Sequence, residues 1–271
     1  MGDGNSLSEE HEAFAVRLAD AAKQETLARF RKGGEVFNKA GIWFDPVTDA
    51  DREAERVQRR MIEAVYPKYG IVGEEFGQQG ADAEYRWVLD PVDGTRSFVC
   101  GLTSWTTLIA LEQRATPILG VIDQPYVQER WIGDGTVCKF HHGDQVSEAS
   151  TSGITSLAKA RLSTTDPRKV AYFTASEASA FEEIAKKAQV TRFGLDAYSY
   201  AMVASGHIDL TIEAGLQHHD WAALVPVVTG AGGVITNWSG RPVGTDDRGE
   251  TIAAATPELH SEVLEIINTL L

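Results

Sequence analysis

The amino-acid sequence predicts an α/β protein, a sandwich with an N-terminal α+β half and a C-terminal α/β half. Two segments with helical periodicity open the chain, and a run of short β-rich segments follows them. After the polar stretch His142–Thr155, strand-like and helix-like segments alternate, which is typical of layered α/β structure. We therefore expect one half over residues 1–150 and the other over residues 151–271.

The first half begins with two expected helices. The first starts near Ser8, carries apolar residues at helical spacing and stops at Gly33-Gly34. Residues 36–46 are expected to form a loop or a hairpin. The second helix runs from about Asp51 to Tyr66, and Pro67 ends it. Turn residues then separate four expected strands, Arg86–Leu89, Thr106–Leu111, Ile118–Ile122 and Glu129–Ile132.

The second half alternates between the two kinds of element. Strands are expected over Ala160–Thr164, Val170–Phe173, Val190–Phe193, His207–Glu213 and Val234–Thr236. Helices are expected over Ala178–Ala188, Tyr198–Ser205, Trp221–Thr229 and from about Pro257 to the end.

The charge balance limits the classes of partner. The 271 residues include 25 Lys and Arg against 39 Asp and Glu, a net charge of −14, so we expect no nucleic-acid surface. The acidity either serves solubility or reflects carboxylates that hold cations. Cys100 and Cys138 form no disulfide framework and lack metal-site spacing, which fits a cytoplasmic protein. We expect neither a secretory signal nor a membrane span.

One motif joins an apolar strand to two aspartates. In Trp87-Val88-Leu89-Asp90-Pro91-Val92-Asp93-Gly94-Thr95 the aspartates stand three residues apart, and Pro91 stiffens the turn between them. Both carboxylates can then converge with a backbone carbonyl, the oxygen ligands that Mg²⁺ prefers. The alternative is a solvated turn, since Asp-Pro and Asp-Gly are common turn pairs.

Two further acidic clusters lie earlier in the chain. Gly73-Glu74-Glu75 follows a short apolar pair, so one glutamate can face a site while the other faces solvent. Asp45-Pro46-Val47-Thr48-Asp49-Ala50-Asp51 places a threonine and aspartates at the start of a helix. Each cluster has a simpler interpretation, a charged surface for the first and helix N-capping for the second.

Taken together, these clusters resemble the inositol monophosphatase superfamily. That family carries Gly-Glu-Glu, then Asp-Pro-aliphatic-Asp-Gly-Thr, and later Trp-Asp-x-Ala; the present chain departs from the last motif, with His219-Asp220-Trp221-Ala222. The resemblance spans roughly residues 35–255 and implies a layered αβαβα sandwich with the active site between the halves. It also covers Val47-Thr48, Asp51, Gly206-x-x-Asp209-Leu210, Glu213 and Gly230-Ala231-Gly232-Gly233.

The resemblance implies two or three Mg²⁺ ions per active site. Glu74, Asp90 and the backbone carbonyl of Val92 would bind the first ion, and Asp90, Asp93 and Asp220 the second. Without cations, four such carboxylates would repel one another. Two cations can stabilise both the attacking and the leaving oxygen of a displacement at phosphorus.

The remaining roles concern water and phosphate. By resemblance, Asp51 and Thr95 activate the attacking water, with Glu74 as a further catalytic residue. Free N–H groups at Gly94 and Thr95, where a helix is expected to open, would bind the phosphate. Lys39 resembles a lysine that assists near the metals, or is an exposed surface residue.

The resemblance implies that the substrate is a small phosphorylated metabolite, and several segments resemble the histidinol-phosphate phosphatase branch. These segments are Asp93–Phe98, which includes Arg96, together with Gly120–Pro125 and Glu129–Gly133. A substrate with an ammonium and an imidazole calls for a further carboxylate, for which Glu213 is the first candidate. Asp196 is the second, unless it is a helix N-cap before Ala197. For His218 and His219 we expect a wall or surface role.

We therefore expect a Mg²⁺-dependent phosphatase that releases phosphate from L-histidinol phosphate in histidine biosynthesis. An inositol-1-monophosphatase or a broad-specificity sugar phosphatase is the alternative. A non-catalytic, metal-dependent binding or regulatory subunit belongs to another class, and the intact set of Glu74, Asp90, Asp93 and Asp220 argues against it. The resemblance also suggests a homodimer.

Overall fold

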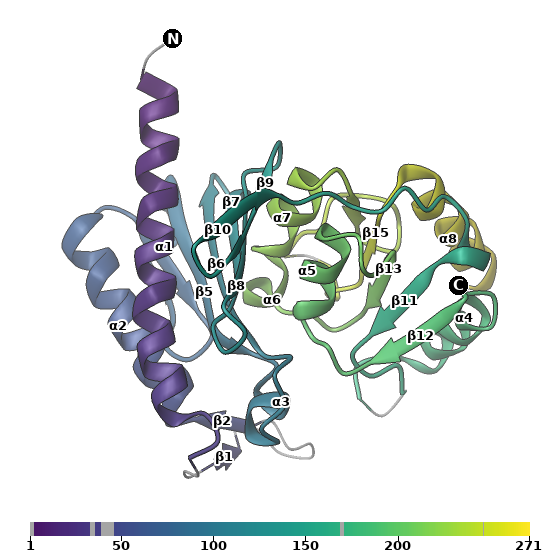
Figure 1. The fold of residues 1–271 in the computed structure, drawn as a ribbon, viewed down its shortest axis with the longest axis horizontal. Coiled ribbons are helices and arrows are strands. Elements are labelled where there is room, and N and C mark those ends of the chain that lie inside the picture. The colour runs from purple at the N-terminus through teal and green to yellow at the C-terminus, as the bar shows by residue number, and fades with distance from the viewer. Residues whose placement is uncertain (1–2, 33–35, 39–45, 169–170, 246) are drawn as a thin grey trace.

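The computed structural model describes residues 3–32, 36–38, 46–168, 171–245 and 247–271. Its helices and strands form five layers in the order α-β-α-β-α, which confirms the layered sandwich (Figure 1). Within the described ranges, no helix is both long enough and apolar enough to span a membrane.

The outer and middle helical layers enclose a large mixed sheet. Helices α1 (Asp3–Arg29) and α2 (Asp49–Val65) cover its outer face, while the middle layer contains α5 (Tyr198–Ala204), α6 (His218–Trp221) and α7 (Leu224–Gly230). The sheet order is β10-β9-β8-β7-β6-β5-β3-β4, with β3 parallel to β5. Its strands are β3 (Gly70–Gly73), β4 (Gly77–Gln79), β5 (Tyr85–Asp93), β6 (Thr106–Gln113), β7 (Thr116–Gln124), β8 (Glu129–Gly133), β9 (Cys138–His142) and β10 (Gln145–Glu148).

A five-stranded sheet follows on the other side of the middle layer, in the order β12-β11-β13-β15-β14. Helices α4 (Ala175–Ala185) and α8 (Pro257–Leu270) form the fifth layer. The chain passes between the sheets after β10, through a short 3₁₀ helix (Leu157–Lys159), and the proposed boundary near residue 150 falls on this connection. The strands are β11 (Arg161–Thr164), β12 (Val190–Phe193), β13 (Leu210–Glu213), β14 (Val234–Thr236) and β15 (Thr251–Ala254).

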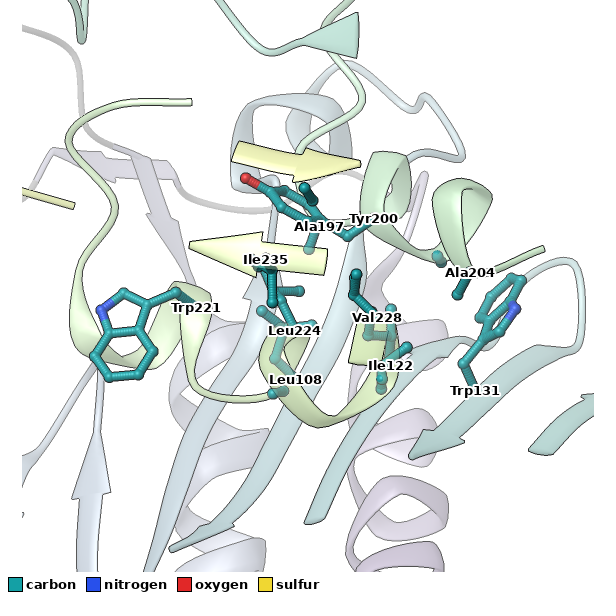
Figure 2. Close-up of a cluster of buried hydrophobic side chains, with 14 of the residues drawn as sticks. Leu108, Ile122, Trp131, Ala197, Tyr200, Ala204, Trp221, Leu224, Val228 and Ile235 are labelled. Atoms are coloured by element: carbon teal, nitrogen blue, oxygen red, sulfur yellow. The ribbon is translucent and has the colours of Figure 1, made fainter. Parts of the chain in front are cut away.

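Alternation along β5 links the two sides of the large sheet. Trp87 and Leu89 pack toward α1 and α2, whereas Val88 packs into the cluster between the sheets. Figure 2 shows this cluster, in which Leu224 and Val228 of α7 lie among residues from both sheets. Strand β5 is buried on both faces between β6 and β3, and the site lies at its end.

Two short elements lie close to that end. Strands β1 (Val36–Asn38) and β2 (Pro46–Thr48) pair antiparallel, so the expected hairpin is present; residues 39–45 lie outside the described ranges. Helix α3 (Thr95–Val99) follows β5 directly, as expected from the sequence.

Several predicted elements are corrected. The strand predicted over Val170–Phe173 is wrong, because residues 171–173 form a turn and loop in which Phe173 is buried without strand pairing. The helix predicted over Trp221–Thr229 is two helices, α6 and α7. Helix α1 begins at Asp3, before the predicted start near Ser8. Strands β4, β9, β10 and β15 were not predicted, and β10 lies within the polar stretch His142–Thr155.

Candidate active site

Strand β5 ends in two carboxylates that meet a third. Side chains alternate along a strand, so Asp90 continues the face of Val88 and points toward the middle layer. The carboxylate of Asp90 accepts a hydrogen bond from the backbone N–H of Val92 at 3.1 Å, and the pairing with β6 changes register between Asp90 and Asp93. Because of this irregularity, oxygens of Asp90, Asp93 and Asp220 lie within 4.8 Å of one another.

Helix α6 holds Asp220 from the C-terminal half. The Asp220 carboxylate accepts the backbone N–H of Gln217 at 2.6 Å, which completes a capping box at the start of this four-residue helix. The helix and the end of β5 are in contact, although about 130 residues of chain separate Asp90 from Asp220. Neither half therefore contains the whole cluster.

Glu74 joins the same cluster from the neighbouring strand. It follows β3, which runs parallel to β5, so the ends of the two strands reach the same edge of the sheet. Further groups of possible ligand atoms within 4.8 Å of one another are Asp51 with Glu74 and Glu75, and Glu74 with Asp90 and His219.

The carboxylates at the site favour one another's protonated forms. The pKa of Asp90 lies well above its usual range because the side chain is buried and Glu74, Asp93 and Asp220 bring like charge. Burial, Asp196 and Asp220 likewise raise the pKa of Asp93 well above its usual range. Carboxylate oxygens in this number fit hard divalent cations, which would supply the missing positive charge.

Asp51 and Thr95 lie side by side at the edge of the cluster. Oγ1 of Thr95 is 3.4 Å from Oδ1 of Asp51 and donates to the backbone carbonyl of Val92 at 3.0 Å. The other oxygen of Asp51 accepts the N–H and hydroxyl of Thr48, so Asp51 is part of the capping box of α2 and also faces the cluster. Burial, with a further contribution from Glu74, raises the pKa of Asp51 to about 6.

Asp196 approaches the turn after β5 from the other half. Gly94 has φ of 76°, and a Cβ on this residue would lie 2.8 Å from Oδ2 of Asp196. Asp196 itself has φ of 49°, a left-handed conformation that aspartate tolerates better than most residues. The N-cap of α5 is Ala197 and lacks a side-chain cap, so the N-cap interpretation of Asp196 is wrong. Burial raises the pKa of Asp196 to about 6.

Glu213 is buried at the end of β13. Its Oε1 accepts the backbone N–H of Thr165 at 2.7 Å and the hydroxyl at 2.8 Å, while Oε2 lies 3.4 Å from the hydroxyl of Thr164. Burial, with the charge of Asp196 among the further causes, raises the pKa of Glu213 to about 8. Oε2, with one long contact, has more remaining capacity to accept than Oε1.

Arg96 lies exposed on α3 and contacts the second half. Its guanidinium donates to the hydroxyl of Tyr172 at 2.6 Å and lies 5.2 Å from the centre of that ring. The pair therefore spans α3 and the loop before α4. Tyr172 was not singled out in the sequence, because an isolated tyrosine in an apolar segment has the pattern of a core residue.

The two histidines before Asp220 differ in their surroundings. Nε2 of His219 is 3.3 Å from the carboxylate of Asp220. His219 therefore lies at the carboxylate cluster, whereas a wall or surface role was expected for it. Nε2 of His218 lies 2.6 Å from the buried carboxylate of Glu112, and its ring packs against Trp221. Lys39 lies outside the described residues.

Comparisons with known proteins agree with this geometry. The model of the "Inositol monophosphatase family" matches residues 7–271. The chain is 39% identical to the bifunctional phosphatase IMPL2 of Arabidopsis thaliana, over 93% of this chain and 73% of the relative. It is 34% identical to a histidinol-phosphatase of Streptomyces coelicolor, over 93% and 94% of the two chains.

A solved structure, an inositol monophosphatase from Zymomonas mobilis, superposes with a TM-score of 0.85 at 39% identity and covers 96% of this chain and 98% of that one. Fold, site and sequence therefore agree on the class of activity, phosphoric monoester hydrolysis. The chain belongs to the inositol monophosphatase family.

Proposed function

We propose that this protein is a Mg²⁺-dependent histidinol-phosphate phosphatase, which converts L-histidinol phosphate and water to L-histidinol and phosphate. The observation that carries the phosphatase part is the convergence of Asp90, Asp93 and Asp220, with Glu74 beside them, next to the Asp51–Thr95 pair. The donor set consists of oxygens, so it fits Mg²⁺ better than softer metals.

In this proposal Glu74, Asp90, Asp93, Asp220 and the carbonyl of Val92 hold two or three Mg²⁺ ions. The bound ions would supply positive charge that stabilises the attacking and leaving oxygens. Thr95 donates its proton to the carbonyl of Val92, so its oxygen is free to accept from a water molecule. Oδ1 of Asp51, 3.4 Å from Thr95 Oγ1, is placed to take the second hydrogen bond of that water and then its proton.

The phosphate would bind where α3 opens. The first N–H groups of a helix have no partner within the helix and favour an anion. Gly94 and Thr95 begin this helix directly after Asp93, so the phosphate would lie between the N–H groups and the acidic cluster. Arg96 is on the same turn and would contribute positive charge at the rim.

The choice of histidinol phosphate rests on two further carboxyl groups, those of Asp196 and Glu213. The charge of Asp196 is among the causes that raise the pKa of Glu213, so ionisation of both carboxyls creates a demand for a nearby positive charge. A substrate ammonium or imidazolium would satisfy this demand by a charge-assisted hydrogen bond, whereas the hydroxyls of an inositol phosphate would not. The histidinol-phosphatase of Streptomyces coelicolor, 34% identical to this chain, supports the same choice.

The test is to measure kcat/KM for histidinol phosphate, inositol 1-phosphate and fructose 1,6-bisphosphate side by side, with and without Mg²⁺. We expect histidinol phosphate to be preferred and all turnover to stop when Mg²⁺ is chelated. Preference for inositol 1-phosphate would favour the alternative, which the Zymomonas mobilis structure at 39% identity also supports. Binding of Mg²⁺ without turnover would favour a non-catalytic subunit. The role in histidine biosynthesis, the homodimer and the cytoplasmic location belong to the same proposal.

A further inference from the structure

Glu55 is a buried carboxylate that the acidic motifs do not include. It lies on α2 with no exposed surface, and both of its oxygens accept hydrogen bonds. Oε2 accepts the backbone N–H of Glu75 at 2.7 Å, and Oε1 accepts the backbone N–H of Phe76 at 3.2 Å. Oε1 also accepts from Nε of Arg59 at 2.7 Å. Glu55 therefore binds the main chain of the turn formed by Glu74, Glu75 and Phe76.

The same turn is held from other directions. Arg59 donates to the backbone carbonyl of Gly77 as well as to Glu55. Two side chains of α2 therefore form hydrogen bonds to the main chain of this turn. The N–H of Glu74 donates to the carbonyl of Leu89 in β5 at 3.2 Å. A Cβ on residue 73 would lie 1.8 Å from Oε1 of Glu55. The carboxylate can therefore approach the main chain this closely because residue 73 is glycine.

Glu55 lies on the same face of α2 as Asp51, which is part of the candidate active site. Asp51 and Glu55 are four residues apart, so they lie on one face of the helix, one turn from each other. Asp51 faces Thr95, while Glu55 fixes the turn that carries Glu74. One helix thus sets the position of Asp51 directly and that of Glu74 through main-chain hydrogen bonds.

We propose that Glu55 is a positioning residue that holds Glu74 in place for cation binding. The inference rests on the proposed function, because it assigns Glu74 to a Mg²⁺ ion. Residues that orient a metal ligand without touching the metal typically cost about 10- to 100-fold in metal affinity or activity when they are changed. A purely structural buried pair of Glu55 and Arg59 would instead affect folding stability alone.

Glu55→Gln keeps the shape of the side chain, but the two terminal atoms can no longer both accept hydrogen bonds. The amide has one acceptor oxygen and one donor nitrogen, so a donor must face the N–H of Glu75, the N–H of Phe76 or the guanidinium of Arg59. The turn should then shift away from α2. The matched control is Glu63→Gln, the same chemical change at an exposed position of the same helix.

The experiment compares wild type, E55Q and E63Q in two measurements, Mg²⁺ titration of para-nitrophenyl phosphate hydrolysis and calorimetric titration of the metal-free proteins with Mg²⁺. For E55Q we expect the half-saturating Mg²⁺ concentration and the calorimetric Kd to rise about tenfold, the low end for groups that orient metal ligands. E63Q should match wild type, and kcat of E55Q at saturating Mg²⁺ should fall much less than its metal affinity.

An E55Q protein with lower Tm and unchanged Mg²⁺ affinity would overturn the inference, as would one with no change at all. If E55Q does not fold, the test uses Arg59→Lys, because a lysine cannot donate to both Glu55 and the carbonyl of Gly77 as the guanidinium does. R59K should also raise the half-saturating Mg²⁺ concentration. An unchanged half-saturating concentration for R59K would overturn the inference. A wild-type protein that neither binds Mg²⁺ nor needs it would instead contradict the proposed function.

Discussion

The carboxylate of Asp93 accepts a hydrogen bond from the backbone N–H of Ala197 at 2.8 Å, which joins the end of β5 to the start of α5. The contact crosses from the N-terminal to the C-terminal half, next to the place where Asp220 meets Asp90. A residue expected to bind metal therefore also ties the halves together. Changes at the cluster can affect stability and activity separately, and the predictions below measure both.

Asp90→Asn should abolish turnover and leave the fold intact. Asp90 belongs to two of the groups of possible ligand atoms, and in the proposal it is a ligand at both cation positions, so its loss weakens both. In metal-free buffer the variant should be at least as stable as wild type, because one of several repelling buried carboxyls is gone. Steady-state kinetics at saturating Mg²⁺ and Tm in chelator check both parts. More than about a tenth of wild-type kcat, a loss below ~1.4 kcal/mol, would contradict the assignment.

Thr95→Ala should lower kcat by about 10²-fold, the low end for loss of a positioned group in proton transfer. The hydroxyl donates to the carbonyl of Val92 and its oxygen lies 3.4 Å from Oδ1 of Asp51, so removal of the hydroxyl leaves the water with Asp51 as its one remaining anchor of the two. KM should change little. Thr95→Ser keeps the oxygen and is the matched control, expected near wild type. A T95A enzyme altered only in KM would mean that Thr95 serves phosphate binding instead.

Mg²⁺ should stabilise the protein more at higher pH. In the cation-free protein the pKa values of Asp90 and Asp93, two of the proposed ligands, are raised well above 3.8, and that of Asp51 beside them is raised to about 6, so the pH window runs from about 4 to above 6. Groups with raised folded pKa stabilise the protein fully below their unfolded pKa, and this stability is lost as pH rises through the folded pKa. In chelator, Tm should thus fall as pH rises through this window, and Mg²⁺ should reverse much of the fall. An increment in Tm from Mg²⁺ that is the same at both ends of the window would contradict this.

The local motifs were predictable because neighbouring residues determine them, whereas contacts across the sandwich, such as that of Arg96 with Tyr172, were not; Asp220 was expected at the site through the family resemblance. The turn from Asp90 to Asp93 follows from an apolar strand and a proline. Strand β10 escaped prediction because all of its side chains are exposed, so the sequence shows no alternation between a buried and a solvent face. Glu55 was missed because a glutamate inside a helix is usually solvated. Its position four residues after Asp51 was the available signal.

Asp209→Asn should destabilise the C-terminal half. Asp209 is buried at the start of β13, and its two oxygens accept from the backbone N–H and the guanidinium of Arg161 and from the hydroxyl of Ser152. These hydrogen bonds hold its pKa below the usual range, so its stabilisation is present above the unfolded pKa and is lost as pH falls through the folded one.

Urea unfolding at neutral pH should show a loss of about 3 kcal/mol for D209N, the low end for breaking a buried pair, because Arg161 is partly exposed. The difference from wild type should shrink in acid. The control Glu183→Gln removes an exposed, solvent-screened pair with Lys186 and should leave stability nearly unchanged. A loss for D209N that is independent of pH would mean that the shape of the side chain matters and its charge does not.

Glu213→Gln and Asp196→Asn should reduce activity on histidinol phosphate more than on inositol 1-phosphate. Both changes keep shape and remove charge, and asparagine tolerates the left-handed backbone of residue 196. Oε1 of Glu213 already accepts two hydrogen bonds from Thr165, so recognition of the substrate falls to Oε2 and to Asp196. A cation there should bring both carboxyls into their charged form.

For each variant we expect a loss of about 1.5–3 kcal/mol in kcat/KM for histidinol phosphate, the range for hydrogen bonds to charged groups. The loss for inositol 1-phosphate should be much smaller, because its hydroxyls bind an amide almost as well as a carboxylate. Because Glu213 also forms hydrogen bonds to Thr165, E213Q should have a structural effect that lowers kcat/KM for both substrates. The ratio of the two kcat/KM values cancels this shared effect. Thr165→Val breaks the hydroxyl contact while leaving both carboxylates, so it should lower both activities together. Equal losses on both substrates for E213Q and D196N would show that the two residues serve structure or hydroxyls, and would make the inositol phosphatase the better reading.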